Sequence, residues 1–215
     1  MKINAVITAG GTSSRFGNKN KLLEKVYGKE IIKYTIDSFE ASNVDEIIVC
    51  SHISIMDELK EIFKDYKKVH FTEGGATRQQ SVYNGLKLSG CDYVIIHDGA
   101  RPMITTDIVN NCIEMVKDMK ALTVATKTID TIKEVENGKI IRTIDRSKLY
   151  NTQTPQAFEY KLIKRAHDKL KDQNFTDDAG MLEALGQTVY ILDGSYKNIK
   201  ITTQFDIETA KIFLK

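Results

Sequence analysis

Several features that would assign a special class of protein are scarce in this chain. Two prolines in 215 residues leave no Pro-rich linker, and Cys50, Cys91 and Cys112 are an odd number without a CxxC pair. A disulfide framework or a structural zinc site is therefore not expected, and a reducing, cytoplasmic location fits best. No apolar run approaches the ~18 residues of a membrane span, and the one near the N-terminus is too short to be expected to act as a signal peptide. The net charge of +2 points to no nucleic-acid or membrane partner, and we expect neither.

Short runs rich in valine and isoleucine alternate with helical patterns along the chain. Strands are expected at 3–8, 46–51, 69–72, 93–97, 122–126 and 188–192, and helices at 29–41, 54–65, 77–89, 105–118, 158–171, 178–185 and 204–214. Nearly continuous apolar strands are typical of a sheet that is covered on both faces. The alternation therefore predicts an α/β fold with a mostly parallel sheet and flanking helices.

Residues 130–146 depart from this alternation. Asn137-Gly138 is a strong signal for a type I′ turn between two short strands. The flanks carry few apolar residues, and a hairpin of this kind is only marginally stable alone. It must therefore pack on something, either its own domain as an ordinary surface hairpin or a second subunit, and the residues alone leave both interpretations open.

The segments that follow the predicted strands carry the chemistry-bearing residues. Ligands of open α/β sheets bind beyond the carboxyl ends of the strands. After the first strand, the backbone at Ala9, Gly10 and Gly11 can approach a phosphate closely, and Arg15 and Lys21 can neutralise its charge. The alternative is a Gly-rich turn with two surface cations. Neither a P-loop nor a dinucleotide-binding fingerprint is present, which argues against an NAD-dependent dehydrogenase.

Two later loops have a similar character. Gly75 belongs to a Gly-Gly pair that precedes the helix expected at 77–89, and Ser81 lies near the start of that helix. Asp98 and Arg101 follow the fourth predicted strand. Asp98 could help to hold Mg²⁺, directly or through water, and Arg101 could bind phosphate. Equally, these two residues could form a structural ion pair. His97 is expected to pack in the core, because no second histidine lies at metal-ligand spacing.

Further along, the adjacent acids of Thr176-Asp177-Asp178 suggest the paired carboxylates of a glycosidase. Adjacent side chains rarely point the same way, so Thr176 is expected to cap a helix and both acids to serve its N-terminus. No base lies in a convincing pattern near Ser81, Cys91 or Cys112, so nucleophilic catalysis is not supported.

Taken together, these motifs resemble those of the 2-C-methyl-D-erythritol 4-phosphate cytidylyltransferases. The similar segments run in order along essentially the whole chain: AGGTSSRFG, NKLL, GGATRQQSV, HDGARP, DTIK, DRSKLYNTQTPQAF, TDDA and NIKIT. The resemblance implies a Rossmann-like fold that transfers a cytidylyl group from CTP to a polyol phosphate and releases pyrophosphate, with Mg²⁺ as cofactor. HDGARP and TDDA favour methylerythritol phosphate as the acceptor. The alternatives are a ribitol 5-phosphate cytidylyltransferase and a non-catalytic nucleotide-binding regulatory domain.

The resemblance also implies roles for individual residues. Catalytic roles fall to Arg15, Lys21, Arg146 and Lys200, of which Arg146 and Lys200 aim the attacking phosphate. The residues implied in nucleotide binding are Ala9, Gly10, Gly11, Gly75, Ser81, Asp98 and Ala100. Those implied around the polyol phosphate are Arg101, Thr131, Arg146, Thr154, Thr176 and Lys200.

The resemblance gives the hairpin a role as well. The chain is expected to be one domain over 1–215 in which residues 130–150 form a β-arm. The arm would reach a partner subunit, so that Thr131 and Arg146 serve the neighbour's site in a homodimer. One departure from the family concerns Asn20-Lys21-Leu22, which lacks the usual proline and glutamine beside the lysine. Lys19 is therefore a second candidate for that role, although spacing favours Lys21.

Overall fold

Strands and helices alternate along most of the chain, as the sequence predicts. The computed structural model describes residues 1–11 and 20–214. Its strands are β1 (Ile3–Ala9), β2 (Lys25–Val26), β3 (Lys29–Glu30), β4 (Glu46–Ser51), β5 (Val69–Glu73), β6 (Tyr93–Asp98), β7 (Ala121–Lys127), β8 (Lys133–Glu136), β9 (Lys139–Thr143), β10 (Tyr150–Glu159) and β11 (Tyr190–Asp193). Its helices are α1 (Ile31–Glu40), α2 (Ile53–Ile62), α3 (Arg78–Leu88), α4 (Thr106–Met119), α5 (Tyr160–Lys169), α6 (Asp178–Ala184) and α7 (Gln204–Phe213), with a 3-10 turn at Arg146–Lys148.

Seven strands form one sheet in the order β11-β7-β10-β6-β1-β4-β5. All neighbours pair in parallel except β10, which runs antiparallel to both β6 and β7. The prediction of a mostly parallel α/β sheet is confirmed. The sequence interpretation missed β10, because buried threonine and glutamine side chains replace the apolar pattern there.

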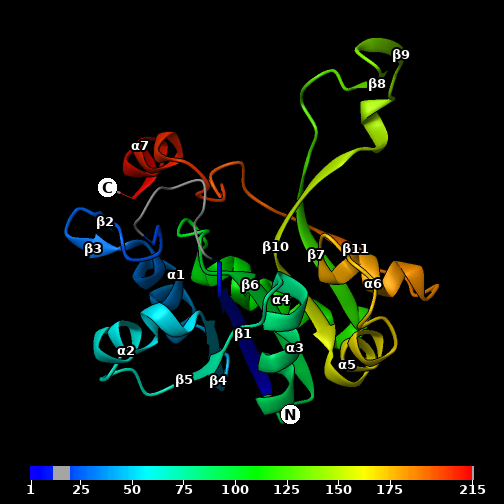
Figure 1. The fold of residues 1–215 in the computed structure, drawn as a ribbon. Helices are drawn as coiled ribbons and strands as arrows, with labels where there is room; N and C mark the ends of the chain where they lie inside the picture. Colours follow the sequence, from blue (N-terminus) through cyan, green and yellow to red (C-terminus); the bar gives the residue numbers. More distant parts are fainter. Residues whose placement is uncertain (12–19, 215) are drawn as a thin grey trace.

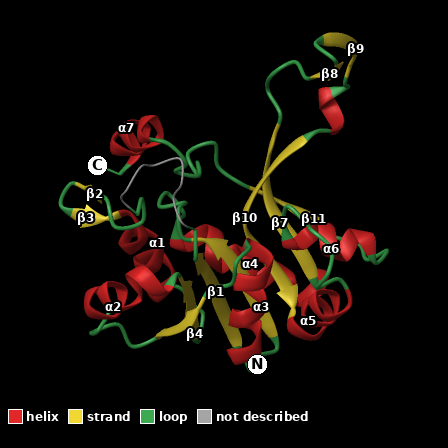
Figure 2. Ribbon diagram, in the orientation of Figure 1, coloured by secondary structure: helices red, strands yellow, loops and turns green. Residues whose placement is uncertain are grey.

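Helices cover both faces of the sheet (Figures 1 and 2). Along β1, Ala5 and Ile7 pack with α1, α2 and α4, whereas Val6 between them packs with α3, α5 and α6. Successive side chains of a strand point to opposite faces, so an unbroken apolar strand supplies two cores at once. A third, smaller core joins α7 to β2 and α1. No described helix is long and apolar enough to cross a membrane.

The hairpin predicted at 130–146 is present as β8 and β9. Asn137 and Gly138 both have positive φ, of 48° and 77°, as a type I′ turn requires. Figure 1 shows the hairpin standing far from the sheet on two extended segments that continue β7 and β10. Among the described strands, β8 and β9 pair only with each other. Within the part of the chain that the structure describes, the arm therefore gains no strand pairing from the central sheet.

Candidate active site

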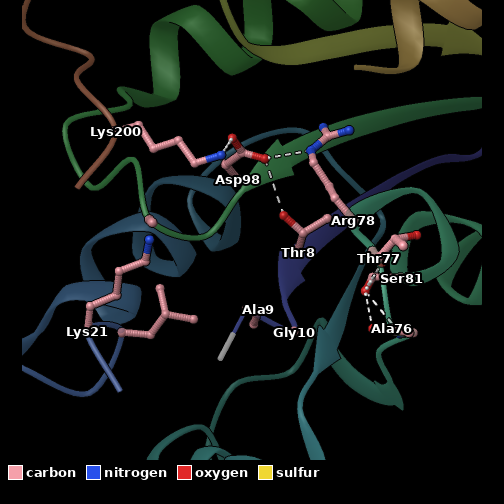
Figure 3. Close-up of a pocket in the computed structure, with 14 residues that line it drawn as sticks. Thr8, Ala9, Gly10, Lys21, Ala76, Thr77, Arg78, Ser81, Asp98 and Lys200 are labelled. Atoms are coloured by element: carbon pink, nitrogen blue, oxygen red, sulfur yellow. Dashed lines mark hydrogen bonds and ion pairs between the residues drawn. The ribbon is translucent and has the colours of Figure 1, made fainter. Parts of the chain in front are cut away.

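The loops beyond the carboxyl ends of β1, β5 and β6 enclose a cavity of about 270 Å³. It is lined by Thr8, Ala9, Gly10, Gly11, Lys21, Leu22, Gly75, Ala76, Thr77, Arg78, Ser81, Asp98, Ala100 and Lys200. Figure 3 shows that Lys21 lies across the cavity from Arg78 and Ser81. Glycine residues and cationic side chains therefore line one space, a combination that suits a nucleoside triphosphate.

Close backbone packing shapes the glycine-rich wall. The Cα of Gly10 would lie 3.3 Å from a Cβ placed on Gly74, and a Cβ on Gly75 would lie 2.3 Å from the Cβ of Gln80. The Ser81 hydroxyl accepts a hydrogen bond from the Gly75 N–H at 3.0 Å and donates to the Thr77 carbonyl at 2.9 Å. Ser81 thus lines the cavity while tying the Gly-Gly loop to the start of α3.

Asp98, at the end of β6, is the electrostatic centre of the site. Its Oδ1 accepts from Arg78 Nε at 3.0 Å, and its Oδ2 lies 2.8 Å from Lys200 Nζ. Arg101 Nε is further away, at 3.8 Å. Burial alone would raise the pKa of Asp98, but Arg78 and Lys200 outweigh it and hold that pKa well below its ordinary value. The carboxylate is therefore ionised and fixes the cations around it.

A second cavity, of about 450 Å³, lies on the other side of this cluster. It is lined by Arg78, Asp98, Arg101, Thr152, Gln153, Thr154, Thr176, Asp177, Gly180, Glu183 and Lys200. Arg78, Asp98 and Lys200 line both cavities. The two spaces therefore share a charged wall, which is suitable for bringing two phosphorylated ligands into contact.

The segment 198–201 is fastened to the loop after β6. Ile201 N–H donates to the Ala100 carbonyl at 2.8 Å, and Arg101 Nη1 donates to the Asn198 carbonyl at 2.7 Å. Asn198, fully buried, donates to the Thr154 carbonyl at 2.9 Å. These bonds place Lys200 beside Asp98 although the two are far apart in the sequence.

A metal ion would find few protein ligands here. Within residues 1–11 and 20–214, no group of three or more His, Cys, Asp and Glu side chains could hold one. Among the described residues that line the first cavity, Asp98 is the only one with a carboxylate. This donor set fits Mg²⁺ only as an ion carried mainly by substrate phosphates and water, its usual mode in phosphoryl-transfer sites.

Comparison with known proteins places this site in a family. The family model described as IspD, 2-C-methyl-D-erythritol 4-phosphate cytidylyltransferase, matches residues 3–215. The chain belongs to this family. A relative of that name from Clostridioides difficile (strain 630) is 41% identical over 98% of this chain and 93% of its own. The crystal structure of 4-diphosphocytidyl-2C-methyl-D-erythritol synthase from Anaerococcus prevotii DSM 20548 is 32% identical, with a TM-score of 0.90 over 99% of this chain and 96% of that one.

Most residues that the family resemblance singled out converge in the structure. Those lining the first cavity are Ala9, Gly10, Gly11, Lys21, Gly75, Ser81, Asp98, Ala100 and Lys200, and those lining the second are Asp98, Arg101, Thr154, Thr176 and Lys200. Thr131 and Arg146 lie in the arm and line neither cavity, and Arg146 donates to the Ile129 carbonyl. Arg15, like Lys19, lies outside the described residues. The structure therefore shows that most of these residues line the two cavities. The catalytic and binding roles that the resemblance implies for them stay predictions.

Two expectations about the TDDA segment need correction. The N-cap of α6 is Asp177, whose side chain accepts from the Gly180 N–H at 3.0 Å, and not Thr176. Asp178 does not serve as a cap, because its buried carboxylate pairs with Arg78 at 2.7 Å and His167 at 3.0 Å. Sequence reasoning also assigned no role to Arg78. Its position at the start of α3, directly after the loop beyond β5, was a signal available in the sequence.

His97 packs in the core, as expected. It is fully buried against the Phe39 ring, and its Nδ1 lies 3.0 Å from the Thr154 hydroxyl. Burial lowers the pKa of His97 to about 3, so the ring is neutral at physiological pH. It supports the loop that carries Asp98.

Proposed function

We propose that this protein transfers the cytidylyl group of CTP to 2-C-methyl-D-erythritol 4-phosphate, giving CDP-methylerythritol and pyrophosphate, a step in isoprenoid precursor synthesis. The observation that carries the proposal is the pair of cavities that share Asp98, Arg78 and Lys200. One space suits the nucleotide, and the other suits the acceptor. Their common wall is where the two phosphates must meet for a direct transfer.

In this arrangement an oxygen of the acceptor phosphate attacks the α-phosphorus of CTP. The new P–O bond forms as the bond to pyrophosphate breaks, so no enzyme nucleophile is needed. Negative charge spreads over the phosphoryl oxygens in the transition state. A cation held at a fixed position therefore stabilises the transition state more than it stabilises the ground state. Lys21, which lines the nucleotide cavity, is suited to this task, and Arg15 is assigned to it by the resemblance.

The second cavity, which we call the acceptor cavity, supplies the contacts with the acceptor phosphate. Arg101 and Lys200 give it positive charge for the acceptor phosphate, and Thr176 offers a hydroxyl for hydrogen bonding. Asp98 pairs with Lys200 and so restrains its ammonium group at the boundary of the two cavities. Holding both reactants at fixed positions removes much of the entropic part of the barrier.

Mg²⁺ is the cofactor that we propose for this reaction. When bound to the triphosphate, it would neutralise charge on the oxygens and make pyrophosphate a better leaving group. Asp98 is the residue that would contact it, directly or through a water molecule. Because Lys200 and Arg78 already neutralise this carboxylate, substrate oxygens would provide most of the ligands.

We also propose that the 130–150 arm joins two such domains into a homodimer. Val135, Ile140 and Ile141 are all more than half exposed on the arm, an apolar surface that a partner subunit would cover. Thr131 and Arg146 would then complete the acceptor cavity of the neighbour. A cytoplasmic location agrees with three free cysteines.

A pyrophosphate-release assay tests the reaction. The protein is supplied with CTP and Mg²⁺, and with methylerythritol phosphate or ribitol 5-phosphate in separate vessels. We expect release with methylerythritol phosphate and little with ribitol 5-phosphate. Turnover with ribitol phosphate alone would overturn the choice of acceptor, and turnover with neither would favour the regulatory alternative.

A further inference from the structure

Arg78 connects two carboxylates that come from distant parts of the chain. It begins α3, and its Nε donates to Asp98 Oδ1 at 3.0 Å while its Nη1 donates to Asp178 Oδ2 at 2.7 Å. A guanidinium group is planar, so two bonds from one group fix the relative orientation of both partners. Arg78 also lines both cavities. Its orientation therefore affects the wall between them.

Asp178 is held in turn by a residue outside the site. Its side chain is 1% exposed, and its Oδ1 lies 3.0 Å from His167 Nε2 on α5. The Asp178 N–H donates to Gln156 Oε1 at 3.0 Å, which fixes the start of α6. His167 lines neither cavity, and its ring stacks on Tyr83 at a centroid distance of 6.1 Å.

The positive charge of Arg78 and the negative charges of Asp98 and Asp178 stabilise each other. Burial alone would raise the pKa of both Asp98 and Asp178, but Arg78, together with Lys200 or His167, lowers each below its ordinary value. Burial opposes the charge of Arg78 too, yet the two carboxylates raise its pKa. A lysine at position 78 would keep the charge but could not span both carboxylates in one plane. The arrangement depends on a guanidinium group at this position.

Resting on the proposed function, we propose that His167, Asp178 and Arg78 act as positioning residues for Asp98 and hence for Lys200. We name these three residues the Arg78 relay. His167 fixes Asp178, Asp178 fixes one side of Arg78, and the other side of Arg78 fixes Asp98. The relay thus couples a helix outside the site to the boundary where the two phosphates meet.

The decisive variants change His167, because it touches neither cavity. His167→Leu removes the bond to Asp178 and should lower kcat/KM for methylerythritol phosphate about tenfold, the scale of losing an outer bond that orients a reacting group. The KM for CTP should change by less than about twofold, because His167 holds the start of α6, whose residues Gly180 and Glu183 line the second cavity and not the first. His167→Gln restores an N–H donor and should recover most of the activity.

Ile163→Ala is the matched control for stability. Ile163 lies on the same helix and is fully buried, but it makes no bond to Asp178. All variants are assayed well below their thermal midpoints. The relay is overturned if His167→Leu and Ile163→Ala, at an equal loss of thermal midpoint, show the same loss of kcat/KM. It is also overturned if His167→Gln recovers none of the lost kcat/KM.

A spectroscopic readout separates failure of the relay from failure of the proposed function. The ¹⁵N resonance of the Arg78 Nε–H, assigned through its loss in Arg78→Lys, reports the bond to Asp98. It should shift or broaden in His167→Leu and stay in place in Ile163→Ala. An unshifted signal in His167→Leu contradicts the relay. Absence of CDP-alcohol formation by the unaltered protein contradicts the proposed function, while the resonance still tests the relay.

Discussion

Replacing Asp98 by asparagine tests the electrostatic centre of the site. The substitution keeps the shape of the side chain but removes the charge that neutralises Arg78, at 3.0 Å, and Lys200, at 2.8 Å. Breaking a buried ion pair by removing one partner costs about 3–5 kcal/mol. Lys200 is 39% exposed, so its share is reduced by solvent. We therefore expect a loss of about 3 kcal/mol in the free energy of unfolding, the lower end of that range.

The pH dependence has a defined sign. The pKa of Asp98 is lower in the folded protein than in the unfolded chain, where it is about 3.9. Its contribution to stability is therefore fully present above the unfolded pKa and is lost as pH falls toward the folded one. The difference between the unaltered protein and Asp98→Asn should be constant near neutral pH and shrink below about pH 4.

Urea denaturation at a series of pH values measures both effects. Glu208→Gln is the control, because Glu208 forms an exposed pair with Lys211 at 2.7 Å that should be worth less than about 1 kcal/mol. A loss for Asp98→Asn no larger than that of the control would show that the Asp98 carboxylate does not stabilise the Arg78 and Lys200 charges. So would a difference that grows as the solution is acidified.

Three further predictions concern catalysis, the glycine wall and the arm. Lys21→Ala should lower kcat at least about 100-fold with a smaller change in CTP affinity, measured by steady-state kinetics and calorimetry, and an unchanged kcat would transfer the role to Lys19. Gly75→Ala should weaken CTP binding about tenfold or more, because its Cβ would lie 2.3 Å from that of Gln80, and normal affinity would show that the loop adapts easily. Mixing inactive Lys21→Ala and Arg146→Ala proteins should restore part of the activity if the arm crosses to a partner. Continued inactivity in proven heterodimers would contradict a shared site.

The alternation of strands and helices could be predicted because its causes are local. The continuous apolar character of β1 arises from Val6 facing one core and Ala5 and Ile7 facing the other. The turn at Asn137-Gly138 was equally predictable, because few residues other than asparagine and glycine tolerate two successive positive φ angles. Strand-end loops then indicated the location of the site.

The features that were missed depend on contacts between distant parts of the chain. β10 has a polar sequence, and its burial is possible because partners such as Asp177 and Thr123 satisfy Gln156. Asp178 resembles a cap when it is considered beside its neighbour, and its bond to Arg78 follows only from how α3 and α6 approach each other. No local pattern contains that information.

The function proposed for this protein is direct transfer of a cytidylyl group to methylerythritol phosphate at the boundary of the two cavities. The most direct measurement supplies CTP, Mg²⁺ and equal amounts of methylerythritol phosphate and ribitol 5-phosphate in one vessel, with products identified by mass spectrometry. We expect CDP-methylerythritol as the main product, formed in step with pyrophosphate. CDP-ribitol as the main product, or no CDP-alcohol at all, would contradict it.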